Sequence, residues 1–468
     1  MAINRDLNAS QVSHPQYLPD PRQATSTSRN NKQAQEVSNT DMTSGDEGSS
    51  IIFLRKIFVF LFYLHLFLVT VLTIFLTVRG MISAANNKHR SFRPREWYSP
   101  ILASTACGGI VALAWPAIVF RSPSRGIMAV LWLSPLLSLG VAILLIYIGT
   151  TGSSVAGALA LISAFVQSLY SCWVNPRIEY AARVISISTS SSRASFNYSC
   201  MVLLSIAIST LYSSVAIAGI GGARATATRL DFVFIVAIIL SFIWTLQVIK
   251  NTLQVTVSHI KYYEFAAAIQ LDAKEVFLNY TAKNSMGTIC FASILVPILT
   301  VIRGTARAVS QVSGDVDEFL FSCSSCSSGI ASCLVAYGNR WGFLRVGVHN
   351  KGIVQASSET WEMFRRAGME QLINSDLTAS ICFFCGIAGG AACSLLGGSW
   401  AFAMHKTYAT EISLYAFLIG YLMSRVTMAL LQACISAYYI AYAENPQSQR
   451  FDNTIIPAYI QRLQRYGA

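Results

Sequence analysis

Long apolar blocks alternate with shorter polar segments along most of the chain. Ten blocks lie at 57–78, 99–120, 126–148, 153–174, 198–220, 231–253, 285–303, 318–338, 377–399 and 411–440. Each is close to the roughly 20 residues that a helix needs to cross the hydrocarbon core of a bilayer. The pattern therefore predicts an all-α fold, a polytopic membrane protein of about ten transmembrane helices. The block 318–338 carries the weakest signal, because it is rich in Ser and Cys, and we expect the long block 411–440 to be tilted or bent.

The two ends of the chain have a different composition from the blocks. Residues 1–50 are rich in Gln, Asn, Ser, Asp and Pro and poor in aromatic residues. Such a segment buries too little apolar area to offset its ordering entropy, so we expect a disordered N-terminal tail. We expect no cleaved signal peptide, with the first span serving as the insertion signal. The predicted organisation is a tail at 1–50, a transmembrane bundle at 51–442 and a C-terminal tail at 443–468.

Composition and charge support lipid as the solvent. Charged residues make up 12% of the chain, hydrophobic residues 53%, and the mean hydropathy is +0.49, whereas charged residues are about 25% of a typical soluble domain. The net charge of +12 is spread between the apolar blocks. No basic stripe or nucleic-acid motif accompanies it, so we expect no nucleic-acid partner.

The distribution of Lys and Arg predicts the orientation of the bundle. With the N-terminus inside, the larger share of basic residues falls in cytoplasmic segments, which places both termini in the cytoplasm. The loop 79–98 opposes this bias, because it carries five basic residues on the predicted outer side. We expect a multi-pass protein of the plasma membrane or an endomembrane.

One predicted span combines an apolar face with a polar stripe. The stretch WTLQVIKNTLQVTVSH occupies residues 244–259. At about 100° per residue, the stripe falls within an arc of about 80°. It consists of Trp244, Gln247, Asn251, Gln254 and Ser258, with Lys250 at its flank. The opposite face is apolar and contains Phe242, Leu246, Ile249, Leu253 and Val257. The polar face should therefore look away from lipid.

Three interpretations of this stripe remain open from the sequence. The span could end near residue 250, with Lys250 reaching the inner headgroups and the remainder forming an interfacial helix. The stripe could instead line a solvated path, because polar groups at membrane depth usually face the bundle interior. Buried Gln and Asn side chains could also simply bond neighbouring helices.

Signatures of an enzyme or a cofactor site are missing from the sequence. It contains no phosphate-binding loop and no HExxH, and its six His residues show no metal-ligand spacing. Cys323 and Cys326 form a CxxC, but their Ser, Gly and Ala neighbours favour helix packing over chemistry. Gly386 and Gly390 form a GxxxG, which also indicates close helix contact. We therefore expect neither catalysis, nor a bound metal, nor a cofactor.

Three segments resemble the choline transporter-like family, especially its compact plant and fungal type. The first is WTLQVIKNTLQVTVSHIKYYEF, which is similar to the signature span of that family. The second is residues 337–377, which contains an Asn-Arg and aromatic pair followed by an R-x-G element. The third is AYAENPQS, which resembles an acidic-Pro motif after the last span. Gln247 departs from the family, where an acidic residue is common, and the loop after the first span is short.

The resemblance implies transport of choline or a related quaternary amine across the lipid bilayer. A quaternary ammonium has no N–H to donate, so aromatic faces suit it best. The expected substrate-binding residues are Trp244, Gln247, Asn251, Gln254, Tyr262, Tyr337 and Trp341. Aromatic residues also gather at membrane interfaces without binding a ligand. The oligomeric state is left open.

Arg425 is a second charge within an apolar block, and it should face protein or water. Glu411 and Asp376 begin neighbouring blocks and are candidate partners for it. An alternative function for the whole chain is a membrane scaffold or trafficking factor that affects lipid sorting without moving a solute. A continuous water-accessible path along 244–258 would distinguish a transporter from a scaffold.

Overall fold

The computed structural model describes most of the apolar part of the chain. The described residues are 47–86, 92–189, 195–226, 228, 230–312, 338–446, 448, 451 and 456–459. The chain separates into two units, residues 1–54 and 55–468. In the first unit, the described residues belong to the start of a helix. The predicted tail at 1–50 and most of the predicted tail at 443–468 lie outside the described residues.

All regular elements in the described ranges are helices, as the sequence predicts. They are α2 (Glu47–Asn86), α3 (Pro94–Arg121), α4 (Pro123–Ile148), α5 (Thr151–Val174), η2 (Asn175–Arg177), α6 (Ile178–Thr189), α7 (Ser195–Thr226), α8 (Asp231–Ala267), α9 (Ala273–Glu275), η3 (Val276–Ser285), α10 (Met286–Val312), α12 (Gly342–His349), α13 (Ile353–Arg366), α14 (Glu370–Asn374), α15 (Thr378–Met404), α16 (Lys406–Thr427) and α17 (Ala429–Glu444). η2 is a 3-10 turn and η3 is a π-helix.

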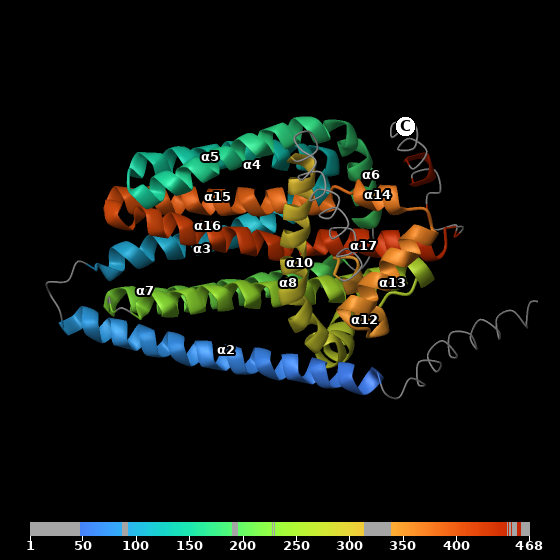
Figure 1. Ribbon diagram of the computed structural model, residues 1–468, viewed down its shortest axis with the longest axis horizontal. Helices are drawn as coiled ribbons and strands as arrows, with labels where there is room; N and C mark the ends of the chain where they lie inside the picture. Colours follow the sequence, from blue (N-terminus) through green and yellow to red (C-terminus); the bar gives the residue numbers. More distant parts are fainter. Residues whose placement is uncertain are drawn as a thin grey trace, which may run out of the picture. The chain divides into compact units, whose positions relative to one another are not determined.

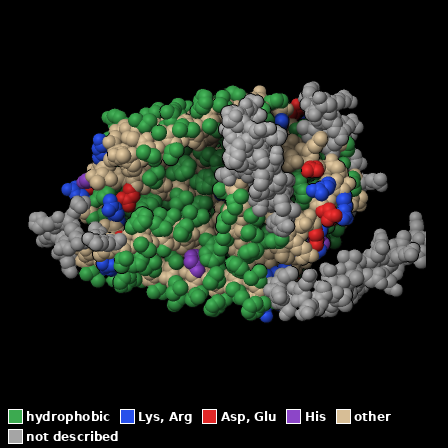
Figure 2. Space-filling view, viewed as in Figure 1, with side chains coloured by type: hydrophobic (Ala, Val, Ile, Leu, Met, Phe, Trp, Pro, Cys, Tyr) green, Lys and Arg blue, Asp and Glu red, His purple; other side chains and the backbone are tan. Residues whose placement is uncertain are grey.

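Nine helical stretches in the described part of the chain are long and apolar enough to cross a membrane. They are Ile52–Ser83, Pro94–Arg121, Pro123–Ile148, Thr151–Thr189, Ser199–Thr226, Asp231–Ala267, Ala273–Ile302, Glu370–Met404 and Lys406–Glu444. Each corresponds to one predicted block. The tenth block, 318–338, lies almost entirely outside the described residues. On the face shown in Figure 2, hydrophobic side chains cover the middle, and charged side chains gather toward the two ends.

The last predicted block is broken in its middle. α16 ends at Thr427 and α17 begins at Ala429, with Met428 between them. Helical hydrogen bonds continue across this residue, from the Met428 N–H to the Ser424 carbonyl and from the Gln432 N–H to the Met428 carbonyl, so the bend expected for this block stays a prediction. Arg425 lies in the final turn of α16, close to this interruption.

Small residues bring α15 and α16 into backbone contact. A Cβ added at Gly390 would lie 2.7 Å from the carbonyl oxygen of Phe417, and one added at Gly420 would lie 2.6 Å from that of Gly389. Side chains larger than hydrogen would push the helices apart at these points. The GxxxG at Gly386 and Gly390 is therefore a helix-packing motif, as the sequence predicts.

α8 occupies a central position among the helices that form the candidate site. It packs against α7, α17, α12, α16 and α10. At 1.5 Å per residue its 37 residues extend for about 55 Å, longer than the roughly 30 Å hydrocarbon core. In Figure 1, α10 crosses the direction of α8 and the other long helices. Pro297 within α10 lacks a backbone N–H, so the carbonyl of Ser293 has no helical donor four residues on.

Candidate functional site

The polar stripe of α8 belongs to one continuous helix that is buried on both faces. α8 shows no break near residue 250. Beyond that residue, Leu253 is 2% exposed and Val257 is 0% exposed, although both lie on the apolar face. A helix lying on the membrane surface would expose these side chains to lipid. The interfacial interpretation is therefore wrong, and the stripe packs within the protein.

The far half of the stripe makes helix-to-helix contacts. Gln254 donates from Nε2 to the carbonyl of Arg340 at 3.3 Å, and His259 Nδ1 lies 2.9 Å from the carbonyl oxygen of Gly347. Ser258 donates to the carbonyl of Val255 within its own helix. This half of the stripe holds the segment around α12 against α8.

The near half of the stripe borders a cavity of about 470 Å³. Gln247, Lys250 and Asn251 contribute its α8 wall. The other walls come from α10, the 339–343 segment, α13, α14, α15, α16 and α17. Their lining residues are Val296, Pro297, Thr300, Val301, Asn339, Arg340, Trp341, Phe343, Trp361, Ile373, Asn374, Asp376, Ala379, Phe383, Tyr421, Arg425 and Gln432. Its volume is in the range of small-molecule sites, about 300–1,000 Å³.

A short anchored segment carries one side of the cavity. Asn339 donates from Nδ2 to the carbonyl of Ser357 at 3.1 Å, and its backbone N–H donates to the Ser357 hydroxyl. Its Oδ1 accepts from the backbone N–H of Gly342, where α12 begins. These bonds fix the backbone on both sides of Arg340 and Trp341, so the two side chains project from a rigid turn.

Arg340 is compensated on two sides. Its guanidinium forms an ion pair with Asp376 and lies 4.4 Å from the centre of the Trp341 ring. Asp376 also accepts from the backbone N–H and the hydroxyl of Thr378, at the start of α15. The carboxylate of Asp376 is 5% exposed. Arg340, Trp341 and Asp376 thus form a satisfied cluster.

Lys250 and Arg425 have no such compensation in the described part of the chain. Lys250 Nζ lies 3.4 Å from the amide oxygen of Asn251, a neutral partner. Neither candidate partner of Arg425 reaches it: Glu411 pairs with Arg224 at 3.1 Å, and Asp376 pairs with Arg340. The expectation that one of these carboxylates would pair with Arg425 is therefore wrong.

Aromatic rings line the cavity beside these charges. Phe383 and Tyr421 meet edge to face with ring centres 6.3 Å apart, and Trp361 and Trp341 contribute further rings. Tyr421 and Arg425 lie one turn apart on α16, so they share a face. Gly386 makes room for both, because an added Cβ would lie 2.9 Å from the Tyr421 ring and 3.1 Å from Arg425 Cδ.

The structure brings together only part of the predicted site. Gln247, Asn251 and Trp341 line the cavity, and Asn251 donates to Ser293 of α10 at 2.9 Å. Gln254 and Trp244 are not among the lining residues. Trp244 donates from Nε1 to the carbonyl of Cys290, and its ring centre lies 4.6 Å from that of His65. The part of these residues in substrate binding stays a prediction.

The two predicted tyrosines lie away from this group. Tyr337 lies outside the described residues. Tyr262 donates to the carboxylate of Glu444 at 2.5 Å, in a second polar region near the end of α8. Its part in substrate binding also stays a prediction.

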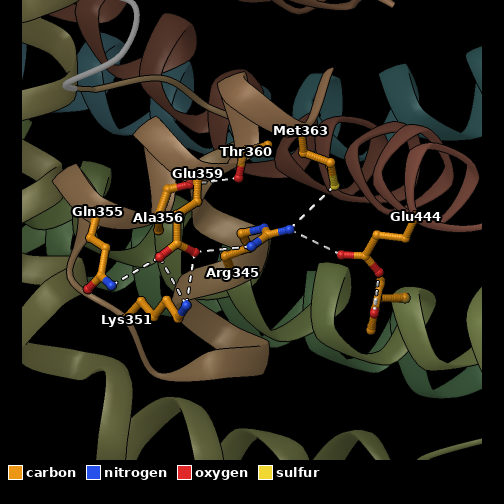
Figure 3. A network of polar contacts seen from close by, with 9 residues as sticks. Arg345, Lys351, Gln355, Ala356, Glu359, Thr360, Met363 and Glu444 are labelled. Atoms are coloured by element: carbon orange, nitrogen blue, oxygen red, sulfur yellow. Dashed lines mark hydrogen bonds and ion pairs between the residues drawn. The ribbon is translucent and has the colours of Figure 1, made fainter. Parts of the chain in front are cut away.

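That second region is an ion-pair network, which we call the Arg345 network (Figure 3). Arg345 contacts Glu359 at 3.1 Å and Glu444 at 3.2 Å. Lys351 also pairs with Glu359, at 2.9 Å. Burial acts to raise the pKa of Glu359, but hydrogen bonds and charges from Lys351, Gln355 and Arg345 outweigh it and hold that pKa below its ordinary value. Two cations and two carboxylates balance here.

The sequence pointed to some cavity residues and missed others. Asp376 was expected as a candidate partner of Arg425, and Arg340 was named as part of the Asn-Arg and aromatic pair; neither was assigned to the substrate site. Trp361, Tyr421 and Gln432 carried no motif. A charge within an apolar block was the available signal for Lys250 and Arg425. The described residues contain no group of His, Cys, Asp and Glu suited to a metal ion, and Cys323 and Cys326 lie outside them.

These features define a class: a multi-pass membrane protein with a polar, aromatic cavity inside its helical bundle. A family model described as plasma-membrane choline transporter matches residues 158–447, which include every residue named in the cavity. The match covers more than half of the chain, and the chain belongs to this family.

Curated relatives with similar sequences are fungal proteins named Protein PNS1. The protein from Mycosarcoma maydis is 29% identical over 232 residues, which cover 45% of this chain and 42% of the relative. The protein from Gibberella zeae is 24% identical over 216 residues, covering 44% and 40%. That from Debaryomyces hansenii is 25% identical over 247 residues, covering 47% of each chain. The matched regions thus span less than half the length of these relatives.

Proposed function

We propose that this protein carries choline or a related quaternary amine across a membrane, with the cavity beside α8 as its binding site. Family membership supports the transporter class. The observation that carries the proposal is the cavity of about 470 Å³, which joins the polar face of α8 to aromatic rings within the bundle. A quaternary ammonium needs such rings, because it offers no hydrogen bond.

The proposed path follows the near half of the α8 stripe. Gln247 and Asn251 face the cavity, whereas Leu246 and Leu253 are 1% and 2% exposed and pack against neighbouring helices. We propose that both termini lie in the cytoplasm, with the cavity opening during transport to one side of a plasma membrane or endomembrane. The remaining predicted binding residues, Trp244, Gln254, Tyr262 and Tyr337, would extend the path beyond the cavity.

Transport by the purified protein is the primary test. Full-length protein in liposomes is supplied with labelled choline, with and without a pH gradient. We expect uptake that saturates and that exceeds that of empty liposomes. Absence of flux for choline and every related amine tried would favour the scaffold or trafficking function instead.

Cysteine accessibility tests the path independently of flux. Single cysteines at 247 and 251 in a cysteine-free background should react with a water-soluble thiol reagent, and choline should slow the reaction. Cysteines at 246 and 253 on the opposite face are matched controls and should react far less. Equal reactivity at all four positions would argue against a path along this face, while reactivity at 254 would extend the path past the cavity.

A further inference from the structure

The described lining residues of the cavity include more basic than acidic side chains, which does not suit a ligand that carries only a positive charge. Three cationic side chains line it, from Lys250, Arg340 and Arg425, and among its described lining residues the one carboxylate is Asp376. Asp376 is already engaged by Arg340 and Thr378. Among the described lining residues, the surplus is therefore two basic side chains, and no described carboxylate pairs either of them.

A surplus of basic side chains among the described lining residues acts against choline, which would add a further positive charge. Like charges in a partly desolvated site repel more strongly than in water. Buried charges in membrane proteins normally find a partner or a water-filled space. A ligand that supplies the missing negative charge would meet both requirements.

We infer that the cavity takes a small zwitterion, in which a quaternary ammonium is joined to an anionic oxygen group, either carboxylate or phosphate. This inference rests on the proposed function and narrows its substrate class. The anionic group contacts Lys250 and Arg425. The ammonium group lies against the rings of Tyr421 and Trp361.

The arrangement on α16 suits a ligand with two ends of different character. Tyr421 and Arg425 are separated by one helical turn, about 5.4 Å along the axis, so an aromatic face and a guanidinium stand side by side. An arginine binds carboxylate or phosphate through two parallel N–H donors, and a lysine binds them as a point charge.

Ligand preference of the wild-type protein is the first test. Binding to the purified full-length protein is measured by competition with labelled choline and by the shift in melting temperature. The probes are choline, glycine betaine, phosphocholine, acetate and inorganic phosphate. We expect glycine betaine or phosphocholine to bind at least about tenfold more tightly than choline, the scale of a charge-assisted hydrogen bond. Which of the two binds more tightly distinguishes carboxylate from phosphate.

Charge-removing variants form the second test. Lys250→Gln and Arg425→Gln should each weaken zwitterion binding by about tenfold and strengthen choline binding, because each removes one unit of repulsion. Lys250→Arg and Arg425→Lys keep the charge and should retain the wild-type preference. Arg224→Gln is the matched control, since Arg224 pairs with Glu411 and does not line the cavity.

The outcomes separate this inference from the proposed function. If choline binds as tightly as both zwitterions, or if the Gln variants weaken choline and zwitterion alike, the zwitterion inference is wrong and choline transport stands. If none of the three amines binds, or if acetate or phosphate binds as tightly as the zwitterions, the proposed amine function itself is wrong.

Discussion

The cavity and the Arg345 network are two polar regions with different charge balance. In the Arg345 network, Arg345 and Lys351 meet Glu359 and Glu444, so each charge has a partner (Figure 3). In the cavity, one pair is satisfied and two cations are not paired by any described carboxylate. A balanced cluster can hold helices together without help, whereas an unbalanced one needs a ligand or water. We propose that this difference separates a structural cluster, the Arg345 network, from a binding site, the cavity.

The largest expected effect comes from breaking the satisfied pair in the cavity. Asp376→Asn or Arg340→Gln leaves one charge without its partner, and each should cost about 3–5 kcal/mol in the free energy of unfolding. Asn at 376 can still accept a hydrogen bond from Thr378, so this substitution removes the negative charge and keeps that hydrogen bond. The double variant should cost less than the sum of the two, as measured by denaturant unfolding in detergent. If the cost of the double variant equalled the sum of the two single costs, the Arg340–Asp376 pair would contribute nothing to stability.

Removing a charge that no described carboxylate pairs should instead raise the free energy of unfolding. A lysine at mid-span costs about 2.5–3.5 kcal/mol on insertion scales, and part of this cost is relieved by the cavity. Lys250→Met should therefore stabilise the ligand-free protein by about 1 kcal/mol while weakening zwitterion binding.

Lys261→Met is the matched control on the same helix. Lys261 pairs with Glu264 at 3.2 Å, so its removal leaves a carboxylate behind and should destabilise the protein. Melting temperatures of the two variants check the comparison. Destabilisation by both would show that Lys250 is compensated like Lys261.

Two tryptophans at different distances from the cavity sharpen the location of the binding site. Trp361→Leu removes a ring that lines the cavity and that the ammonium is proposed to contact, and should raise the half-saturating amine concentration by about tenfold, or about 1.4 kcal/mol. Trp244→Leu makes the same change outside the cavity. The Trp244 contacts with His65 and the Cys290 carbonyl favour an effect on protein abundance.

Flux normalised to surface protein distinguishes the two positions. Trp244 lies on the polar face of α8 and was predicted from the sequence as a substrate-binding residue. A tenfold rise for Trp244→Leu at normal abundance would extend the binding path toward α2. No rise for Trp361→Leu would remove its ring from the site.

The smallest expected effect is the pH response of the Arg345 network. The pKa of Glu359 is lowered in the folded protein from its ordinary value of 4.5, with burial opposing and Lys351, Gln355 and Arg345 favouring the shift. A lowered pKa contributes stability that is present above pH 4.5 and is lost as the pH falls through the folded value. The melting temperature of wild type should thus fall more steeply below pH 4.5 than that of Glu359→Gln. Parallel curves would contradict this role.

Much of the fold was predictable from hydrophobic pattern alone. Nine of the ten predicted blocks correspond to described helices that can span a membrane, because the thickness of the hydrocarbon core sets a length that apolar runs reveal directly. The close contact at Gly390 was also foreseen, from small residues at helical spacing. These properties are local or depend on the lipid, so no knowledge of the partner helix is needed.

The candidate site was predictable only in part. Periodicity showed that Gln247, Asn251, Gln254 and Ser258 share one face of α8, but not what lies opposite each turn of it. The structure puts a cavity opposite Gln247 and Asn251 and puts the carbonyl of Arg340 opposite Gln254. Helical periodicity shows on which face of α8 a side chain lies. Which residue or cavity lies opposite each turn of α8 depends on how the other helices pack against it.

Charge balance is the property that only the tertiary structure decided. The sequence alone established a lipid-embedded chain with a lysine and an arginine inside apolar blocks. It left open that Asp376 would meet Arg340, that Glu411 would meet Arg224, and that Arg425 would meet neither. An ion pair depends on a separation of a few ångströms between residues that are far apart along the chain. Packing of the helices sets that separation, and with it the chemistry of the cavity.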